Sequence, residues 1–361
     1  MKYKWLFSLL VASSMVLTSC MPNDSIEDVA IVQLAGYDYI DENQIKGTFA
    51  VAQYTKGEQK AAATEIYLTS TADTAKNIHA NLQTKSSKPI STGKMSIALF
   101  NEELAKQDIS KFIDSLTRDP RIGRDIFLAV VNGEAQGMIE GKYEQNETTA
   151  RYIMGIIEHN MKRNFPNTNL HSFLHSYYGN GVDGFLPYLK KSKDFIKMEG
   201  IAFLDDSRLA LTIPYSKSLF FKMMKEKVSE GVQEIQFQGD GIMIESINSK
   251  VEYYIEGGTE NPKFLIDIRV TGVLNEISNL EDSSNPKRIH KMEKEFNEIF
   301  EKQCLALIQQ FQENNIDPLG LGSILDNRSR NFDVKAWNDK YPDTPVDVKV
   351  TMDITETGIS S

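Results

Sequence analysis

Cysteine, histidine and tryptophan are scarce in this chain, and so are the sequence patterns through which enzymes use them. The 361 residues include two cysteines, five histidines and two tryptophans. Two cysteines form at most one disulfide, which excludes a small disulfide-built scaffold, and a chain of this length can be held together by its core. Neither the Gly-x-Ser-x-Gly turn of a hydrolase nor a phosphate-binding glycine loop occurs. The sequence therefore predicts a non-catalytic protein without a cofactor.

Basic residues are also fewer than acidic residues. Lysine and arginine number 40 against 50 aspartates and glutamates, which gives a net charge of -10. Such an acidic chain is a poor partner for nucleic acid, because the neutralisation of phosphates needs clustered Lys and Arg. Apolar runs that could span a bilayer are missing too, since a spanning helix needs about 20 apolar residues. We expect neither nucleic-acid binding nor a transmembrane helix.

What the chain does have, at its start, is the pattern of an export signal. Two lysines precede an apolar run from Trp5 to Leu17, which is too short for a membrane span and is typical of a cleaved signal peptide. The box Leu17-Thr18-Ser19-Cys20 resembles that of bacterial lipoproteins, in which small residues precede a cysteine that receives lipid. This resemblance predicts that residues 1–19 are removed by cleavage between Ser19 and Cys20.

Cys20 is then the predicted lipidation site, with S-diacylglycerol and N-acyl groups such as palmitate. One acyl chain binds a membrane only marginally and two hold a protein there, so the mature protein is expected to be tethered to the lipid bilayer through Cys20. Two alternatives remain open: an ordinary secretory signal with an incidental cysteine, and a cytosolic protein with an apolar start.

Helical and strand patterns are mixed along the chain without a regular strand-helix-strand alternation. This favours an α+β fold over a doubly wound sheet, and we expect a multi-lobed protein whose mixed or antiparallel β-sheets are flanked by α-helices. An irregular stretch rich in glycine and proline, 165–194, is the best candidate for a boundary. The predicted N-terminal α+β region is therefore 20–194 and the C-terminal α+β region 195–361.

In the N-terminal region, 26–35 and 45–54 are predicted to form an antiparallel hairpin, with Gly36-Tyr37-Asp38 closing its first strand. Asn101 is predicted to cap a helix with acidic residues in its first turn. The other expected elements are a helix that starts near Thr71 and Thr74 and ends near Gln83, strands at 94–100 and 125–131, and helices at 109–116 and 147–164.

In the C-terminal region, 195–204 and 209–213 are predicted to pair around an Asp205-Asp206-Ser207 tip. A helix at 215–227 and a long helix at 291–314 follow from apolar residues at three- and four-residue steps. Four successive strands, expected to form a meander, are predicted at 232–237, 241–247, 251–255 and 264–273. The strict alternation from Val346 to Ile354 predicts a last strand with one face on a core.

Residue groups that suggest chemistry all have a simpler structural interpretation. His171 and His175 would share a helix face as zinc ligands do, but no third ligand lies near them, so no metal site is predicted. Gly320-Leu321-Gly322 follows Asp317-Pro318 and is interpreted as a helix-entry turn, not a dinucleotide loop. Asp205 and Asp206 belong to a hairpin tip. Cys304 is interpreted as a small buried apolar residue.

Five segments follow the predicted lipidation site in a recognisable order. They are Ile26 to Val32, Ala35 to Asp38, Phe100 to Lys106 with Ile113 to Ile122, Met198 to Leu204, and Ile316 to Gly322 with Trp337. Together these segments resemble the Ger(x)C family of spore germination lipoproteins, the C subunits of nutrient germinant receptors. The resemblance spans essentially the whole chain.

The resemblance implies a non-catalytic role and a fold of β-sheet lobes flanked by helices. Such subunits are held on the outer face of the spore inner membrane and assemble with a membrane-embedded A subunit and a transporter-like B subunit. The receptor senses nutrients and commits the spore to germination. The alternative is an extracytoplasmic solute-binding lipoprotein that serves a transporter, which predicts two lobes with parallel sheets. An extracytoplasmic hydrolase would need a catalytic grouping that the sequence does not offer.

Overall fold

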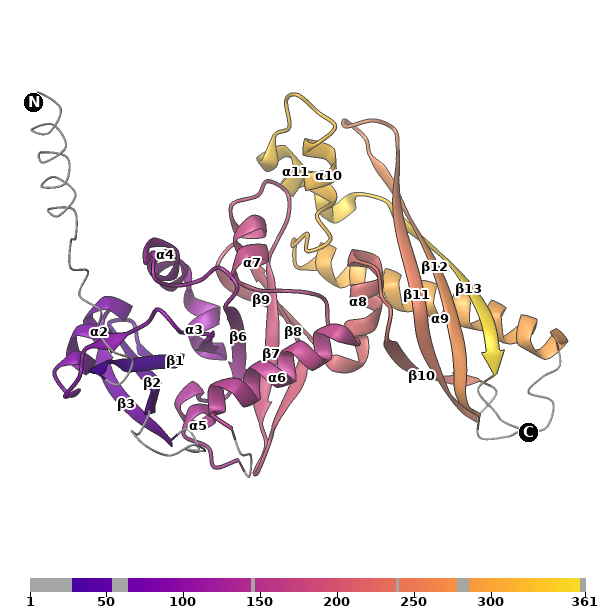
Figure 1. The fold of residues 1–361 in the computed structure, drawn as a ribbon. Coiled ribbons are helices and arrows are strands. Elements are labelled where there is room, and N and C mark those ends of the chain that lie inside the picture. Colours follow the sequence, from indigo (N-terminus) through magenta and orange to yellow (C-terminus); the bar gives the residue numbers. More distant parts are fainter. Residues whose placement is uncertain (1–27, 54–63, 144–146, 238–239, 278–285, 358–361) are drawn as a thin grey trace, which may run out of the picture.

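Two β-sheets organise the chain in the computed structural model, which describes residues 28–53, 64–143, 147–237, 240–277 and 286–357 (Figure 1). The first sheet follows the order β3 (Thr64–Ala72), β2 (Gln44–Gln53), β1 (Ala30–Asp41), β5 (Ile97–Asn101), β6 (Phe127–Asn132), β7 (Phe185–Lys191), β8 (Ile196–Asp205) and β9 (Arg208–Pro214), with β4 (Ile90–Ser91) beside β1. The second follows β10 (Gly231–Phe237), β11 (Asp240–Glu256), β12 (Lys263–Ile277) and β13 (Val346–Thr357).

Helices cover both faces of the first sheet. One face carries α2 (Ala75–Gln83), α3 (Glu102–Gln107), α4 (Ser110–Arg118) and α7 (Leu170–Tyr177). The other carries α5 (Ala135–Ile139) and α6 (Thr149–Lys162). The short helix η2 (Tyr215–Lys217) follows β9 and contacts β8 of the first sheet. Near the second sheet lie α8 (Ser218–Lys225), α9 (Pro286–Glu313), α10 (Leu321–Asp326), α11 (Val334–Lys340) and η3 (Tyr341–Asp343). In Figure 1 the sheets lie at opposite ends of the molecule, with α8 between them.

The predicted α+β class is confirmed, but the expected lack of a strand-helix-strand alternation was wrong. Strands β1, β5, β6 and β7 are all parallel neighbours, and helices connect β5 to β6 and β6 to β7. Such an alternation therefore does exist in the middle of the first sheet. It is hidden in the sequence because antiparallel pairs, β1 with β2 and β7 with β8, flank it on both sides. The sheet is mixed, as the fold class required.

The first sheet continues across the division predicted at 194 and 195. Strand β7 pairs antiparallel with β8, which pairs with β9, and the turn between β7 and β8 is closed by the Ser192 N–H donating to the Phe195 carbonyl at 2.8 Å. The change from one sheet to the other falls after β9. The irregular stretch 165–194 itself contains α7 and β7, whose short lengths weaken their periodic signal.

Two predicted strand divisions are wrong, and one strand was missed. Gly36-Tyr37-Asp38 lies in the middle of β1, which continues to Asp41. The strands predicted at 241–247 and 251–255 are one strand, β11, whose register shifts between Ser246 and Asn248. A bulge of this kind lets a strand continue past an extra residue, so the polar residues here, which in the sequence indicate a turn, lie within the strand. Strand β3 carries no clear alternation in its sequence and was not predicted.

Other predictions are confirmed. The β1–β2 and β8–β9 hairpins form, and β10, β11 and β12 are consecutive antiparallel neighbours. Strand β13 buries alternate residues and pairs in parallel with β12. The predicted long helix is α9, and its apolar stripe is buried. One continuous apolar cluster extends from the α5–α6 face of the first sheet to α9 and β13, so the two sheets share a core.

Candidate functional site

The predicted lipidation site, Cys20, and the cleavage position after Ser19 lie outside the described residues. They stay predictions. In the described part of the chain, no helix has the length and apolarity needed to cross a membrane.

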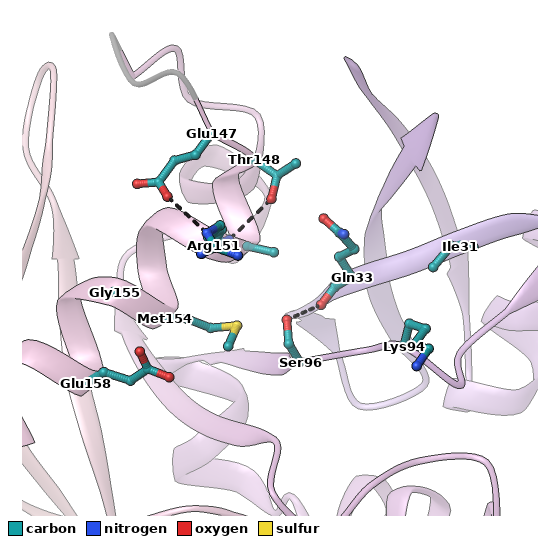
Figure 2. A pocket seen from close by; sticks show the side chains of 11 residues that line it. Ile31, Gln33, Lys94, Ser96, Glu147, Thr148, Arg151, Met154, Gly155 and Glu158 are labelled. Carbon is teal, nitrogen blue, oxygen red and sulfur yellow. Dashed lines mark hydrogen bonds and ion pairs between the residues drawn. The ribbon is translucent and has the colours of Figure 1, made fainter. Parts of the chain in front are cut away.

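A cavity of about 890 Å³ lies between β1, the segment just before β5 and helix α6 (Figure 2). On the helix side, the Thr148 hydroxyl accepts a hydrogen bond from the Arg151 N–H at 3.3 Å, and Glu147 forms a 3.7 Å ion pair with the same arginine. On the strand side, the Ser96 hydroxyl donates to the Gln33 carbonyl at 3.0 Å. The side-chain oxygen of Gln33 is buried without a partner. The cavity offers polar contacts, and its lining contains no cysteine or histidine.

The histidines singled out in the sequence are both exposed. His171 and His175 lie on α7 and border a second cavity of about 520 Å³, together with Lys225 and Glu226. Within the described ranges, no group of three or more His, Cys, Asp or Glu side chains is placed to hold a metal ion.

Cys304 is buried, as predicted. It has no exposed surface and lies on α9 within the shared core. Burial raises the pKa of its thiol far above the usual range, so the reactive thiolate is strongly disfavoured. The residue therefore acts as a small apolar side chain.

The Gly36-Tyr37-Asp38 motif holds helix α5 against β1. The buried Asp38 carboxylate accepts hydrogen bonds from the backbone N–H groups of Ala135 (2.6 Å) and Gln136 (2.9 Å). These donors are the first N–H groups of α5, which have no partner inside the helix. A Cβ at Gly36 would overlap the end of the Ile139 side chain and lie 3.1 Å from the Ala135 Cβ, so glycine lets the helix approach the strand closely without displacing these side chains. The motif is a helix cap within a strand, not a turn.

The Asp317 motif forms an equivalent cap at α10. The Asp317 carboxylate, 4% exposed, accepts hydrogen bonds from the N–H groups of Gly320, Leu321 and Gly322 at 2.9, 3.0 and 2.7 Å. Gly320 adopts a φ of +77°, which favours glycine. The helix-entry turn predicted here is confirmed.

Gly322 also brings two distant segments together. A Cβ there would overlap the Trp337 Nε1 and would lie 2.8 Å from the Gly181 Cα. The Gly181 carbonyl accepts a hydrogen bond from the Ser323 N–H at 2.8 Å. The loop that precedes β7 therefore packs directly on the start of α10. Sequence spacing gave no signal for this contact, because its two sides are far apart along the chain.

Charged side chains that are partly or fully buried lie close together at the same junction. Asp183 accepts a hydrogen bond from the Asp317 N–H at 2.6 Å, and the Lys225 ammonium donates to the Pro318 carbonyl at 2.7 Å. Burial raises the pKa of Asp183 to about 7 and that of Asp317 to about 6, while burial lowers the pKa of Lys225. Shifted carboxyl groups are common in active sites, but here the carboxylates bind backbone donors of their own chain, which is a structural use.

The fold and these contacts define the class: a two-sheet α+β protein whose recognisable motifs are helix caps and close backbone contacts. Comparison with known families identifies it further. The family described as "Spore germination protein N-terminal domain" matches residues 23–191, and "Spore germination B3/ GerAC like, C-terminal" matches residues 199–358. The chain belongs to this GerAC family of spore germination proteins, as its sequence motifs predicted.

Individual relatives agree with this assignment. The spore germination protein GerQC of Bacillus cereus is 27% identical over 361 residues, covering 99% of each chain. The putative spore germination protein YfkR of Bacillus subtilis strain 168 is 21% identical, covering 99% of this chain and 97% of the relative. The crystal structure of the GerBC protein superposes with a TM-score of 0.59 at 17% identity, over 89% of this chain and 97% of that one. The last comparison supports the fold alone.

Proposed function

We propose that this chain is the lipid-anchored, non-catalytic C subunit of a nutrient germinant receptor, required for nutrient-triggered germination. The observation that carries the proposal is the match of both GerAC family domains, in order, across residues 23–358. These domains follow the lipoprotein-like box Leu17-Thr18-Ser19-Cys20. A membrane-embedded A subunit and a transporter-like B subunit are the proposed partners. The proposed location is the outer face of the spore inner membrane.

The length of the tether limits how far the body can lie from the bilayer. Ala30, the first residue of β1, lies ten positions after Cys20. A fully extended chain spans at most about 3.5 Å per residue, so the start of β1 would lie within roughly 35 Å of the lipid attachment. That reach keeps the first sheet close to membrane-embedded partners.

Deletion of the gene in the spore-forming host tests the proposal. We expect the mutant spores to lose the response to one nutrient or nutrient mixture, and to respond normally to the others and to a germinant that bypasses the receptors. Restoring the intact gene should restore the lost response. Normal germination of the deletion mutant in every nutrient that triggers the parent would contradict the proposal.

The alternative, a solute-binding lipoprotein, predicts two lobes with parallel sheets. The second sheet instead has antiparallel strands β10, β11 and β12, with parallel pairing at β13 only. The two sheets also share one apolar core, whereas two binding lobes would each have a core of their own. The sheet topology and the shared core therefore speak against this alternative.

A further inference from the structure

A cavity of about 460 Å³ lies beneath α2 and α4, on the face of the first sheet opposite to α6. Its apolar lining comes from Tyr37, Phe49, Met95 and Leu116, all of which are buried. The Tyr37 ring belongs to an aromatic cluster with Phe49, whose ring centroid is 6.4 Å away. Such a lining offers contact area to an aromatic or aliphatic group. The volume is within the range of about 300–1,000 Å³ that is usual for small-molecule sites.

The rim of this cavity is basic, although the whole protein is acidic. It carries Lys76, His79, Arg118 and Arg121 against a single carboxylate, that of Asp119. Asp119 is already engaged, because it accepts hydrogen bonds from the Arg121 Nε and Nη2 at 2.9 and 2.7 Å. Lys76 and Arg118 are therefore the rim cations whose charge Asp119 does not neutralise.

Those two cations have weak protein partners. Arg118 has a long contact of 3.4 Å with Asp114, and its side chain is 76% exposed. Lys76 is exposed and forms no ion pair with the described residues. The His79 Nε2 is buried without a hydrogen-bond partner, which is costly unless a ligand or water supplies one. The rim thus offers two weakly paired cations that could bind an anion, next to an apolar lining.

We propose that this cavity binds an amphipathic organic anion, with its carboxylate or phosphate group at Lys76 and Arg118 and its apolar part against Tyr37 and Leu116. A guanidinium presents parallel N–H donors that match the geometry of carboxylate and phosphate oxygens. The same chemistry is offered by a free small anion and by the headgroup region of an anionic phospholipid. This inference goes beyond the proposed function and does not depend on it, because binding is measured on the purified chain.

The test uses the full chain carrying Cys20→Ala, so that lipid does not contribute. Phenyl phosphate and 3-phenylpropionate are titrated by calorimetry, with 2-phenylethanol as the uncharged probe. Flotation with vesicles of phosphatidylglycerol in phosphatidylcholine, against pure phosphatidylcholine, forms the second arm. The variants are Lys76→Gln and Arg118→Gln, which alter exposed side chains. Lys162→Gln on α6 is the matched control, since it removes the same charge from the opposite face of the sheet.

We expect at least one anionic probe to bind, 2-phenylethanol to bind more weakly, and each rim variant to weaken anion binding about tenfold, while Lys162→Gln binds as the parent does. Binding of the free anions identifies a soluble ligand as the source. Binding confined to phosphatidylglycerol vesicles, and lost in the rim variants, identifies a lipid. Absence of binding in both arms overturns the proposal. Equal loss in the Lys162→Gln control, or unchanged binding in both rim variants, overturns it as well.

Discussion

Gly181 is the residue on which the contact between the two halves of the chain depends most directly. It has a φ of +62°, and a Cβ there would lie 2.7 Å from backbone atoms of Gly322. The loop before β7 is joined to this segment by hydrogen bonds from the Ser323 N–H to the Gly181 carbonyl and from the Asp317 N–H to Asp183, while the Asp317 carboxylate fixes the start of α10. The residues that carry the family resemblance at this junction therefore maintain the fold.

Gly181→Ala should lower the free energy of unfolding by about 3 kcal/mol, of which about 1 kcal/mol comes from the left-handed backbone and the rest from backbone overlap. Gly258→Ala is the matched control. Gly258 has a φ of +70°, and a Cβ added there would have no atom within 4 Å, so it isolates the conformational cost of about 1 kcal/mol. Urea denaturation followed by circular dichroism measures both. Equal losses in the two variants would contradict the proposed contact.

Asp183 gives the junction a dependence on pH. Burial raises its pKa to about 7, and that of its neighbour Asp317 to about 6, whereas both are near 4 in an unfolded chain. The folded state therefore binds more protons between these values, so the stabilisation from these groups is complete below about pH 4 and is lost progressively as the pH rises from about 4 to about 7. The negative charges of Asp205 and Asp206 raise the pKa of Asp183 and so add to this effect. The positive charge of Lys225 lowers the pKa of Asp317 and so opposes it.

Asp183→Asn should reduce the fall in the free energy of unfolding between about pH 5 and about pH 8, because an amide cannot ionise. Urea midpoints across this range measure the slope. Asp343→Asn, which alters an exposed carboxyl, is the control and should keep the slope of the parent. A variant slope at Asp183 as steep as that of the parent would show that this carboxyl is not responsible.

At the scale of elements, helix α9 covers the β13 edge of the second sheet. Alternate N–H groups of β13 donate to side-chain oxygens one helical turn apart on α9. The three bonds join Val350 to Glu301 at 2.9 Å, Met352 to Asn297 at 2.8 Å and Ile354 to Glu293 at 3.1 Å. An open strand edge is a template for pairing with another chain, and this ladder of side chains occupies the donors that such pairing would use.

Asn297→Ala should destabilise the protein by about 1 kcal/mol, the usual net value of a hydrogen bond, since it removes the central acceptor of the ladder. Hydrogen exchange should also become faster at the Met352 amide. Glu298→Ala changes the adjacent, exposed position on the same helix and should cost less than about 0.5 kcal/mol. If the Met352 amide exchanges equally slowly in both variants, the side-chain cap is not what protects this edge.

Most elements with strong periodicity or a cap could be predicted from the sequence. The Asn101 cap of α3, the buried stripe of α4 and the alternation of β13 are local patterns, and the structure confirms each of them. Gly36-Tyr37-Asp38 was misjudged because glycine and aspartate usually indicate a turn, whereas here they serve a helix that lies about a hundred residues further along the chain. Caps and close contacts supplied from distant segments leave no periodic signal.

At the scale of the whole molecule, the division near residue 194 does not separate two independent cores. The family domains meet between residues 191 and 199, but the sheet passes through this point and one apolar cluster extends from the first sheet to α9. The anion-binding cavity proposed beneath α2 and α4 was not visible in the sequence either, because its lining comes from several separate segments. Family membership, by contrast, was predicted from ordered motifs alone.

The measurement that tests the central claim most directly is the fate of a Cys20→Ala protein in spores. We predict that the variant folds normally but is lost from the inner-membrane fraction, or released from it by salt, and that the nutrient response which depends on this protein is weakened. Immunoblots of fractionated spores and germination assays on the same preparations measure both effects. A Cys20→Ala protein that stays in the membrane fraction and supports full germination would contradict lipid anchoring at Cys20.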